Sequence, residues 1–324
     1  MTMKTNAVVI SAPGQVGLQE VALRPFSPQD VIVQTAYTSI SAGTERMLLA
    51  GQMPHPMLQL PVIPGYETVG QIVEIGDEVD ASWLNRWVYV GGAQCYDGIN
   101  AAWGGQSAKL AVDVSRVIPL DEVEPRHGVL LALAATALHG INLLDPQPGD
   151  RLLVLGQGPV GQLAARLARI RGAWVAVTDR NEHRLAHAEA DQIVQVGEGH
   201  APLNEQIEGG VTAVIEATGS MTALAESLPL LAQKGTILLL GYYQNLQLPY
   251  MPLFLKEARL LTAKEWAPGD LQHCRDLIAN GTLDVSAMLT HCLPITEVAT
   301  AYEVALNDAN CLKLVLDWQN APSN

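Results

Sequence analysis

The sequence predicts an α/β protein in which a β-rich part is joined to a doubly wound parallel sheet. Short strand-like segments follow one another at close spacing from Thr5 to about Val117, which suggests a small barrel or sandwich. From residue 152 onward, strand and helix patterns alternate, and this alternation is typical of a doubly wound sheet. The chain of 324 residues is long enough for two domains with large cores.

The strands expected in the first part are short and are separated by turns that contain Pro and Gly. They cover residues 7–10, 16–22, 30–37, 69–75, 87–90 and 106–112, and two loops, 39–65 and 91–105, interrupt them. Near Arg126 the pattern changes to a helix rich in Leu and Ala. The second part is expected to hold strands at 152–155, 173–178, 193–196, 211–215 and 236–240, with helices at 159–171, 181–190 and 221–233. A helix at about 270–279 and a final helix and strand complete the chain.

A glycine fingerprint, LGQGPVG, lies between the first strand and the first helix of the second part. Gly156 permits a tight turn, Gly158 leaves room for a pyrophosphate, and Gly161 lets helix and strand pack closely. Pro159 suits the first helical turn, because its missing N–H costs nothing there. Asp179 follows the next strand, close to the separation of about 20 residues that the fingerprint requires. The pattern predicts a Rossmann dinucleotide-binding domain, and the alternative is a glycine-rich turn in a nucleotide-free α/β domain.

Parallel strands bring their carboxyl ends to one edge of a sheet, where doubly wound proteins bind ligands. Gly156, Asp179, Glu216 and Gly241 end predicted strands, so we expect the cofactor at this edge. Asp179 is expected to bind the adenosine ribose, which favours NAD, although it can also cap the next helix. The adjacent Arg180 can accept the 2′-phosphate of NADP. Further residues expected to contact the cofactor are Val160, Ala217, Gly219 and Lys313. For Lys313, a solvated charge near a strand is the alternative.

Composition restricts the partners and the compartment. The formal net charge is −14, which argues against nucleic acid or an anionic membrane as a partner. We see no signal peptide and no apolar run of the roughly 18 residues that a membrane span needs. The four cysteines are scattered without a CxxC motif, so we expect free thiols and a cytoplasmic protein.

Motifs along nearly the whole chain resemble those of the medium-chain dehydrogenase/reductase superfamily. They are ISAGTE at 40–45, PGYE at 64–67, LAATALHG at 133–140, GQGPVG at 156–161, EATG at 216–219, LLLGYY at 238–243 and LKLVLDW at 312–318. The resemblance implies a GroES-like catalytic domain at 1–130 and 286–324, because the last segment returns to the first part in that superfamily. It also implies a Rossmann domain at 131–285, with Thr136 facing the nicotinamide. For Thr136, the alternative is an ordinary buried helical residue.

The zinc-ligand positions of this superfamily are changed here. Zinc-dependent members have Cys-Gly-Thr-Asp where this chain has AGTE at 42–45, and Gly-His-Glu where it has GYE at 65–67. Their third ligand is commonly a Cys at the position of Ala132. The four-cysteine structural zinc loop is also absent, since only Cys95 lies in that region. A catalytic zinc needs about three protein ligands, so we expect no metal site.

Without zinc, another group must handle the proton of an oxidised hydroxyl. Tyr66 occupies a zinc-ligand position of the superfamily, and we expect its phenol to help. Ser41, Thr44 or His139 could relay the proton, and Glu67 could orient the site. The alternative is that Tyr66 only fills the space that the metal leaves.

A narrower set of motifs resembles the bacteriochlorophyllide a dehydrogenase family. It consists of SISAGTE, PGYE without His, GGAQCYDG, LALAATALHG, KEW and CLKLVLDW. The resemblance implies NAD-dependent oxidation of a bacteriochlorophyllide 3-hydroxyethyl group to 3-acetyl in bacteriochlorophyll a biosynthesis, with a tetrapyrrole as the small-molecule substrate. The alternatives are a zinc-free quinone or enoyl reductase and a nucleotide-binding protein without turnover. The sequence leaves open whether the protein is a homo-oligomer.

Overall fold

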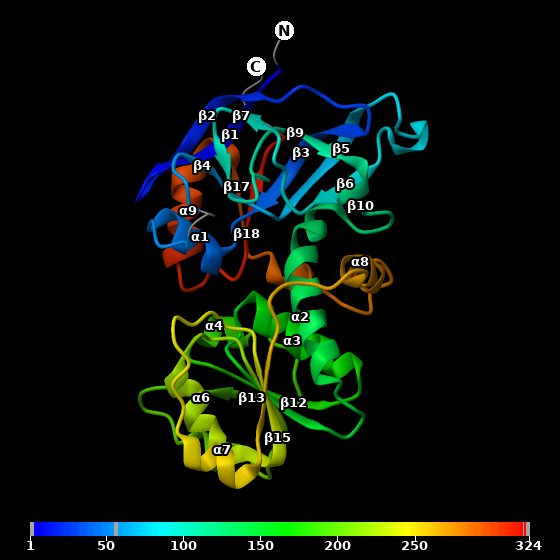
Figure 1. The fold of residues 1–324 in the computed structure, drawn as a ribbon. Helices are drawn as coiled ribbons and strands as arrows, with labels where there is room; N and C mark the ends of the chain where they lie inside the picture. Colours follow the sequence, from blue (N-terminus) through cyan, green and yellow to red (C-terminus); the bar gives the residue numbers. More distant parts are fainter. Residues whose placement is uncertain (1–2, 55–57, 320, 322–324) are drawn as a thin grey trace. The chain divides into compact units, whose positions relative to one another are not determined.

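The computed structural model describes residues 3–54, 58–319 and 321, and the chain divides into two compact units (Figure 1). The first unit contains Met1–Ala132 and Leu289–Asn324, and the second contains Leu133–Met288.

The first unit is mainly β-structure. Its strands are β1 (Lys4–Ala12), β2 (Gln15–Leu23), β3 (Asp30–Ser39), β4 (Val62–Ile63), β5 (Thr68–Ile75), β6 (Trp87–Val90), β7 (Tyr96–Asp97), β8 (Asn100–Ala101), β9 (Lys109–Asp113), β10 (Val117–Pro119), β17 (His291–Pro294) and β18 (Leu314–Asp317). Its α-helices are α1 (Ala42–Leu49) and α9 (Val298–Asn307). Short 3-10 helices lie at η1 (Ala81–Trp83), η2 (Val114–Arg116), η3 (Pro125–Leu130) and η6 (Ile295–Glu297).

Two sheets build the first unit. One has the order β7-β2-β1-β4-β8, and the other has the order β10-β6-β5-β3-β18-β17, with β9 paired to β3. Strand β18 from the C-terminal segment pairs antiparallel with β3, so the chain end completes a sheet that the N-terminal residues begin. This pairing brings Lys313, just before β18, into the unit that holds Tyr66 and Glu67.

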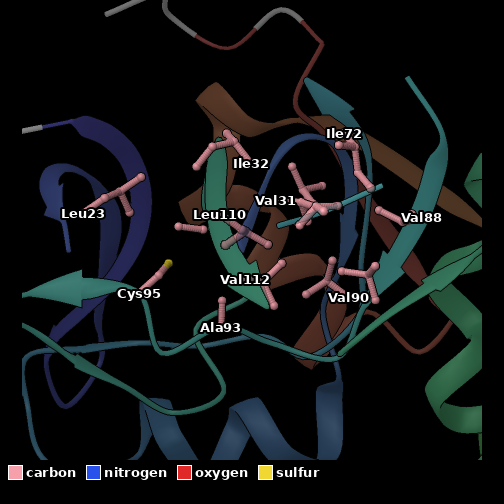
Figure 2. Packing of buried hydrophobic residues seen from close by; sticks show 14 residues of the cluster. Leu23, Val31, Ile32, Ile72, Val88, Val90, Ala93, Cys95, Leu110 and Val112 are labelled. Carbon is pink, nitrogen blue, oxygen red and sulfur yellow. The ribbon is translucent and has the colours of Figure 1, made fainter. Parts of the chain in front are cut away.

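A core of aliphatic side chains holds the strands of the first unit together. Val31 and Val33 on β3 are two residues apart, so they face the same side of the sheet, and both are fully buried. Figure 2 shows Val31, Leu110 and Val112 gathered at the centre of this cluster. Because β3 is central, nearly all of its residues are buried.

The second unit is a doubly wound parallel sheet. Its strands are β11 (Arg151–Leu155), β12 (Trp174–Asp179), β13 (Gln192–Gln195), β14 (Val211–Glu216), β15 (Leu231–Leu239) and β16 (Arg259–Thr262). Its helices are α2 (Leu131–Leu144), α3 (Pro159–Ile170), α4 (Glu182–Leu185), α5 (Leu203–Gln206), α6 (Met221–Ser227), α7 (Tyr250–Lys256) and α8 (Asp270–Ala279), with η4 (Leu228–Leu230) and η5 (Ser286–Met288). The strand order is β13-β12-β11-β14-β15-β16, and every pair is parallel. The predicted α/β class and parallel sheet are confirmed.

Several expected element bounds are wrong. The segment 39–65 is more than a loop, since it contains α1 and β4. The helix expected at 181–190 is only α4, because the chain turns where Arg166 Nη2 donates to the carbonyl of His187, 2.9 Å away. The helix expected at 221–233 ends at Ser227, since Pro229 lies in η4 and β15 already begins at Leu231. Elements α7 and β16 were not expected.

Among the residues that the structure describes, one helical stretch, Pro125–Leu144, is long and apolar enough to cross a membrane by length and composition alone. Its most apolar window is 67% buried inside the protein, which is typical of a core helix. The expectation that no apolar run is long enough for a membrane span is therefore wrong by length and composition. The burial of the stretch is nevertheless typical of a core helix.

Candidate active site

Three hydroxyl groups meet at Tyr66 in the first unit. Ser41 Oγ lies 2.5 Å from Tyr66 Oη, and Thr44 Oγ1 lies 3.2 Å from the same atom. Ser41 is the N-cap residue of α1 and Thr44 lies in its first turn, so one short helix supplies both neighbours. Tyr66 and Thr44 are partly exposed, whereas Ser41 is buried. The structure thus brings three predicted catalytic residues together.

The backbone on either side of Tyr66 fixes its ring. Gly65 has φ +96°, and a Cβ there would lie 2.5 Å from Gln106 Cγ, so only glycine fits this turn. The hydroxyl of Tyr89 donates to the carbonyl of Tyr66 at 2.7 Å. Trp103 packs against the ring edge-on, with centroids 5.2 Å apart. The phenol is therefore held in a defined direction.

Glu67 lies next to Tyr66 but is buried, with 1% of its surface exposed. Its Oε2 accepts hydrogen bonds from Ser39 Oγ and from Lys313 Nζ, the latter at 2.5 Å. Its Oε1 has no hydrogen-bond partner among the residues that the structure describes. Lys313, itself buried, forms an ion pair with this carboxylate. A cofactor contact of Lys313 stays a prediction, since its ammonium group is already paired.

The surroundings of Tyr66 keep its phenol protonated. Burial, followed by the negative charge of Glu67, raises the pKa of Tyr66 above its ordinary value, despite the hydrogen bonds from Ser41 and Thr44. A neutral phenol both donates and accepts a hydrogen bond. Tyr66 is therefore suited to relaying a proton or polarising an oxygen, and unsuited to acting as a phenolate base.

A buried acid beside this cluster was missed by the sequence analysis. Glu45 is 1% exposed, and its carboxylate accepts a hydrogen bond from the backbone N–H of Ser41 at 3.0 Å. Gln106 and Tyr302 also donate to it. The spacing could have predicted its burial, because Glu45 lies three residues before Leu48 on the same face of α1.

The donor set at the zinc-ligand positions does not fit a catalytic zinc. Ala42 and Ala132 carry no ligand atom, and the hydroxyl of Tyr66 is hydrogen-bonded to two other hydroxyl groups. Within residues 3–54, 58–319 and 321, no group of three or more His, Cys, Asp or Glu side chains could hold a metal ion.

The glycine turn of the second unit has the geometry that a pyrophosphate needs. Gly156 has φ +88° directly after β11, and a Cβ on Gly161 would lie 1.9 Å from the carbonyl oxygen of Gly156. A Cβ on Gly158, the N-cap of α3, would meet nothing within 4 Å. Pro159 and Val160 then form the first turn of α3, whose free N–H groups favour an anion. The chain's own residues therefore fit a dinucleotide.

Asp179 ends β12 at the same edge of the sheet. Its Oδ2 accepts from the backbone N–H of Gln157 at 2.7 Å, and its Oδ1 accepts from Asn181 N at 2.9 Å. The carboxylate thus ties the glycine turn to the start of α4. Each carboxylate oxygen has a further lone pair, so this role is compatible with binding a ribose. Arg180 is exposed beside it.

The ends of β14 and β15 come together around Glu216. Its carboxylate accepts from the backbone N–H groups of Thr218 at 2.7 Å and Gly219 at 3.1 Å. Burial raises its pKa. A Cβ on Gly241 would lie 2.6 Å from Glu216 Oε2 and 2.7 Å from Gly219 N. Ala217 lies close to the first turn of α3, 3.5 Å from where a Cβ on Gly161 would be.

Thr136 and His139 lie three residues apart on α2, and both are partly exposed. His139 Nδ1 is 3.7 Å from Asp270 Oδ2 in α8 of the same unit. Asp270 also accepts from Asn142 at 3.3 Å. The relay between His139 and Tyr66 stays a prediction, because the two residues belong to different units.

Family models match both units. A model of the alcohol dehydrogenase GroES-like domain matches residues 27–122, and a model of zinc-binding dehydrogenases matches residues 159–280. The chain is 34% identical to a 2-desacetyl-2-hydroxyethyl bacteriochlorophyllide A dehydrogenase of Cereibacter sphaeroides, over 98% of this chain and 99% of that protein. A protein of the same name from Rhodobacter capsulatus is also 34% identical, over 98% of this chain and 100% of its own length.

Solved structures share the fold. A protein described as a short chain alcohol dehydrogenase from Escherichia coli CFT073, solved with NADH, has a TM-score of 0.85 at 20% identity, over 97% of this chain and 99% of its own. A candidate zinc-binding dehydrogenase from Sinorhizobium meliloti 1021, solved with NADP, has a TM-score of 0.82 at 24% identity, over 98% and 100%. With the family matches, these likenesses confirm the predicted GroES-like and Rossmann architecture.

Proposed function

Because this chain belongs to the medium-chain dehydrogenase/reductase superfamily and is an oxidoreductase of the alcohol dehydrogenase type, we propose that it oxidises the hydroxyethyl group at position 3 of a bacteriochlorophyllide to an acetyl group. NAD is the proposed hydride acceptor, and no catalytic zinc takes part. The substrate is supported by the names of two relatives that match nearly the full length of this chain.

The observation that carries the zinc-free proposal is the hydroxyl cluster at Tyr66. Where zinc-dependent relatives have ligands, this chain has two alanines and a phenol that contacts Ser41 and Thr44. Oxidation of an alcohol requires its O–H proton to leave as hydride leaves the carbon. In this proposal the substrate hydroxyl donates its proton to Tyr66 Oη while Tyr66 passes its own proton along the cluster, and the partly exposed Thr44 releases a proton to water. Glu67, paired with Lys313, raises the pKa of Tyr66 and so keeps its phenol protonated and able to donate.

The second unit binds the cofactor in this proposal. NAD supplies the hydride-accepting ring when bound. Gly158 leaves space for its pyrophosphate, and the first turn of α3 offers N–H groups to the phosphates. Asp179 accepts the ribose hydroxyls and repels a 2′-phosphate, which supports NAD over NADP.

The proposal is tested by an absorbance assay of the purified protein with a 3-hydroxyethyl bacteriochlorophyllide and NAD. We expect NADH to form together with the 3-acetyl pigment, and the rate to survive treatment with a strong chelator. Loss of turnover on chelation, restored by added zinc, would refute the zinc-free part. Oxidation of NADPH by quinones without pigment turnover would favour a reductase. Nucleotide binding without any turnover would favour a non-catalytic protein.

A further inference from the structure

Glu45 is a buried carboxyl group to which the proposed reaction assigns no role. It lies on α1, between the hydroxyl cluster of Tyr66 and helix α9. Its Oε1 accepts from Ser41 N at 3.0 Å and from Gln106 Nε2 at 3.2 Å. Its Oε2 accepts from the same Gln106 nitrogen at 3.0 Å and from the hydroxyl of Tyr302. The carboxyl group therefore joins its own helix to two other segments of the chain.

The hydroxyl of Tyr302 has two acceptors but only one proton. It lies within hydrogen-bond distance of Glu45 Oε2 and also 3.1 Å from Gln106 Oε1. When Glu45 is ionised, Tyr302 donates to it. When Glu45 is protonated, the carboxyl group can donate to Tyr302, and Tyr302 can then donate to Gln106. The same heavy-atom positions thus satisfy both protonation states, so either state is accessible.

Glu45 is also coupled to the hydroxyl cluster. Its contact with the backbone N–H of Ser41 fixes the residue whose Oγ lies 2.5 Å from Tyr66 Oη. The negative charge of ionised Glu45 contributes to the raised pKa of Tyr66. A change of charge on Glu45 therefore alters the electrostatic field in which the cluster relays a proton.

We propose that Glu45 is a positioning residue whose protonation state controls the Ser41–Tyr66 hydroxyl pair, so that the reaction is faster when Glu45 is ionised. The catalytic consequence rests on the proposed function. Ionised Glu45 places a negative charge near the cluster, which stabilises the positive charge that develops there while the proton released by the alcohol is relayed. The neutral form removes that attraction while preserving the packing.

The groups that face Glu45 make its titration relevant at neutral pH. Burial raises the pKa of Glu45 to about 7, while the hydrogen bonds from Tyr302 and Ser41 N oppose this shift. Among charged groups, Glu67 raises this pKa further and Lys313 lowers it. Because the folded-state pKa lies above the ordinary value of 4.5, the folded state binds the proton more tightly. The stabilising contribution of the neutral carboxyl group is therefore lost as the pH rises toward 7.

The first test needs no substrate. Infrared difference spectra between pH 5 and pH 9 should contain the carbonyl band of a buried carboxylic acid that titrates near pH 7. This band should be absent in Glu45→Gln, whose amide imitates the protonated carboxyl group, and present in Glu122→Gln, which alters an exposed acid of the same unit. A spectrum that is unchanged in Glu45→Gln would overturn the proposal. So would a band that titrates in the ordinary range of exposed glutamates.

The second test measures turnover against pH with the pigment and NAD. The unaltered enzyme should lose activity below about pH 7, and Glu45→Gln should lose this dependence. At pH 8 the variant should turn over about 10-fold more slowly, which corresponds to a loss of about 1.4 kcal/mol of transition-state stabilisation. Tyr302→Phe should move the pH midpoint while keeping it visible. An active enzyme whose pH profile is the same in Glu45→Gln would refute the inference. Absence of pigment turnover with an intact infrared titration would refute the proposed function alone.

Discussion

Tyr66 illustrates how one residue acquires its chemistry from its neighbours. Its sequence position only identifies it as a replacement for a zinc ligand. Burial and the charge of Glu67 behind it raise its pKa and keep it a neutral phenol, although the hydrogen bonds with Ser41 and Thr44 oppose this shift. The prediction that Tyr66 handles a proton is retained as a relay, because a phenol with a raised pKa is a poor base.

The change Tyr66→Phe deletes the hydroxyl group and keeps the ring that packs against Trp103. If the hydroxyl relays the proton, turnover should fall by roughly 10²–10⁴-fold, the range for general acid–base groups, while NAD affinity stays unchanged. Steady-state kinetics and cofactor titration measure the two quantities. Near-normal turnover would mean that Tyr66 only fills space.

At the scale of elements, two glycines of the β11–α3 turn have different roles, one in folding and one in binding. Gly161 is required by the protein itself, since its Cβ would overlap the carbonyl oxygen of Gly156. Gly158 has free space at its Cβ position, so the protein alone does not require a glycine there. Its use is explained if a pyrophosphate occupies that space.

Two matched variants test this division. Gly161→Ala should destabilise the protein by about 1–3 kcal/mol, the cost of overpacking, and also weaken NAD binding. Gly158→Ala should leave stability within about 0.5 kcal/mol, as for surface substitutions, but weaken NAD binding. Thermal unfolding and NAD titration check both variants. Unchanged NAD affinity in Gly158→Ala would place the pyrophosphate elsewhere.

At the scale of the whole molecule, the C-terminal segment completes the first unit. Strand β18 pairs with β3, with Leu316 opposite Thr38. Trp318 follows β18, is 2% exposed, and donates from Nε1 to Thr38 Oγ1 at 2.8 Å. The same return delivers Lys313 to Glu67. Stability of the first unit and the charge balance of the candidate site therefore depend on the last residues of the chain.

Trp318→Ala should destabilise the first unit by about 3–5 kcal/mol, the usual cost of removing a large buried aromatic side chain. NAD affinity should change little, because the residues proposed to bind NAD lie mainly in the second unit. Calorimetry should show the loss, and Trp318→Phe should lose less, since it keeps an aromatic ring. If Trp318→Ala also weakened NAD binding strongly, NAD binding by the second unit would depend on the folding of the first unit.

The local elements with regular patterns could be predicted from the sequence. The glycine turn, α3 and strands β11 and β12 follow from residue spacing, because tight turns and apolar runs constrain the nearby backbone directly. The early ends of the helices near His187 and Ser227 could not be predicted from propensity. In the first case Arg166, on another helix, donates to the carbonyl of His187, and this tertiary contact competes with continuation of the helix.

The sequence by itself determined the α/β class, the dinucleotide fingerprint and the replacement of zinc ligands by alanine and tyrosine, because each depends on residue identity and spacing. Only the tertiary structure decided which polar groups meet. Glu45 contacts Tyr302 across 257 positions, and Glu67 contacts Lys313 across 246. No local pattern encodes such pairs, since they form only when the C-terminal segment folds back beside β3. Burial then raises the pKa of Glu45, which its sequence neighbours do not reveal.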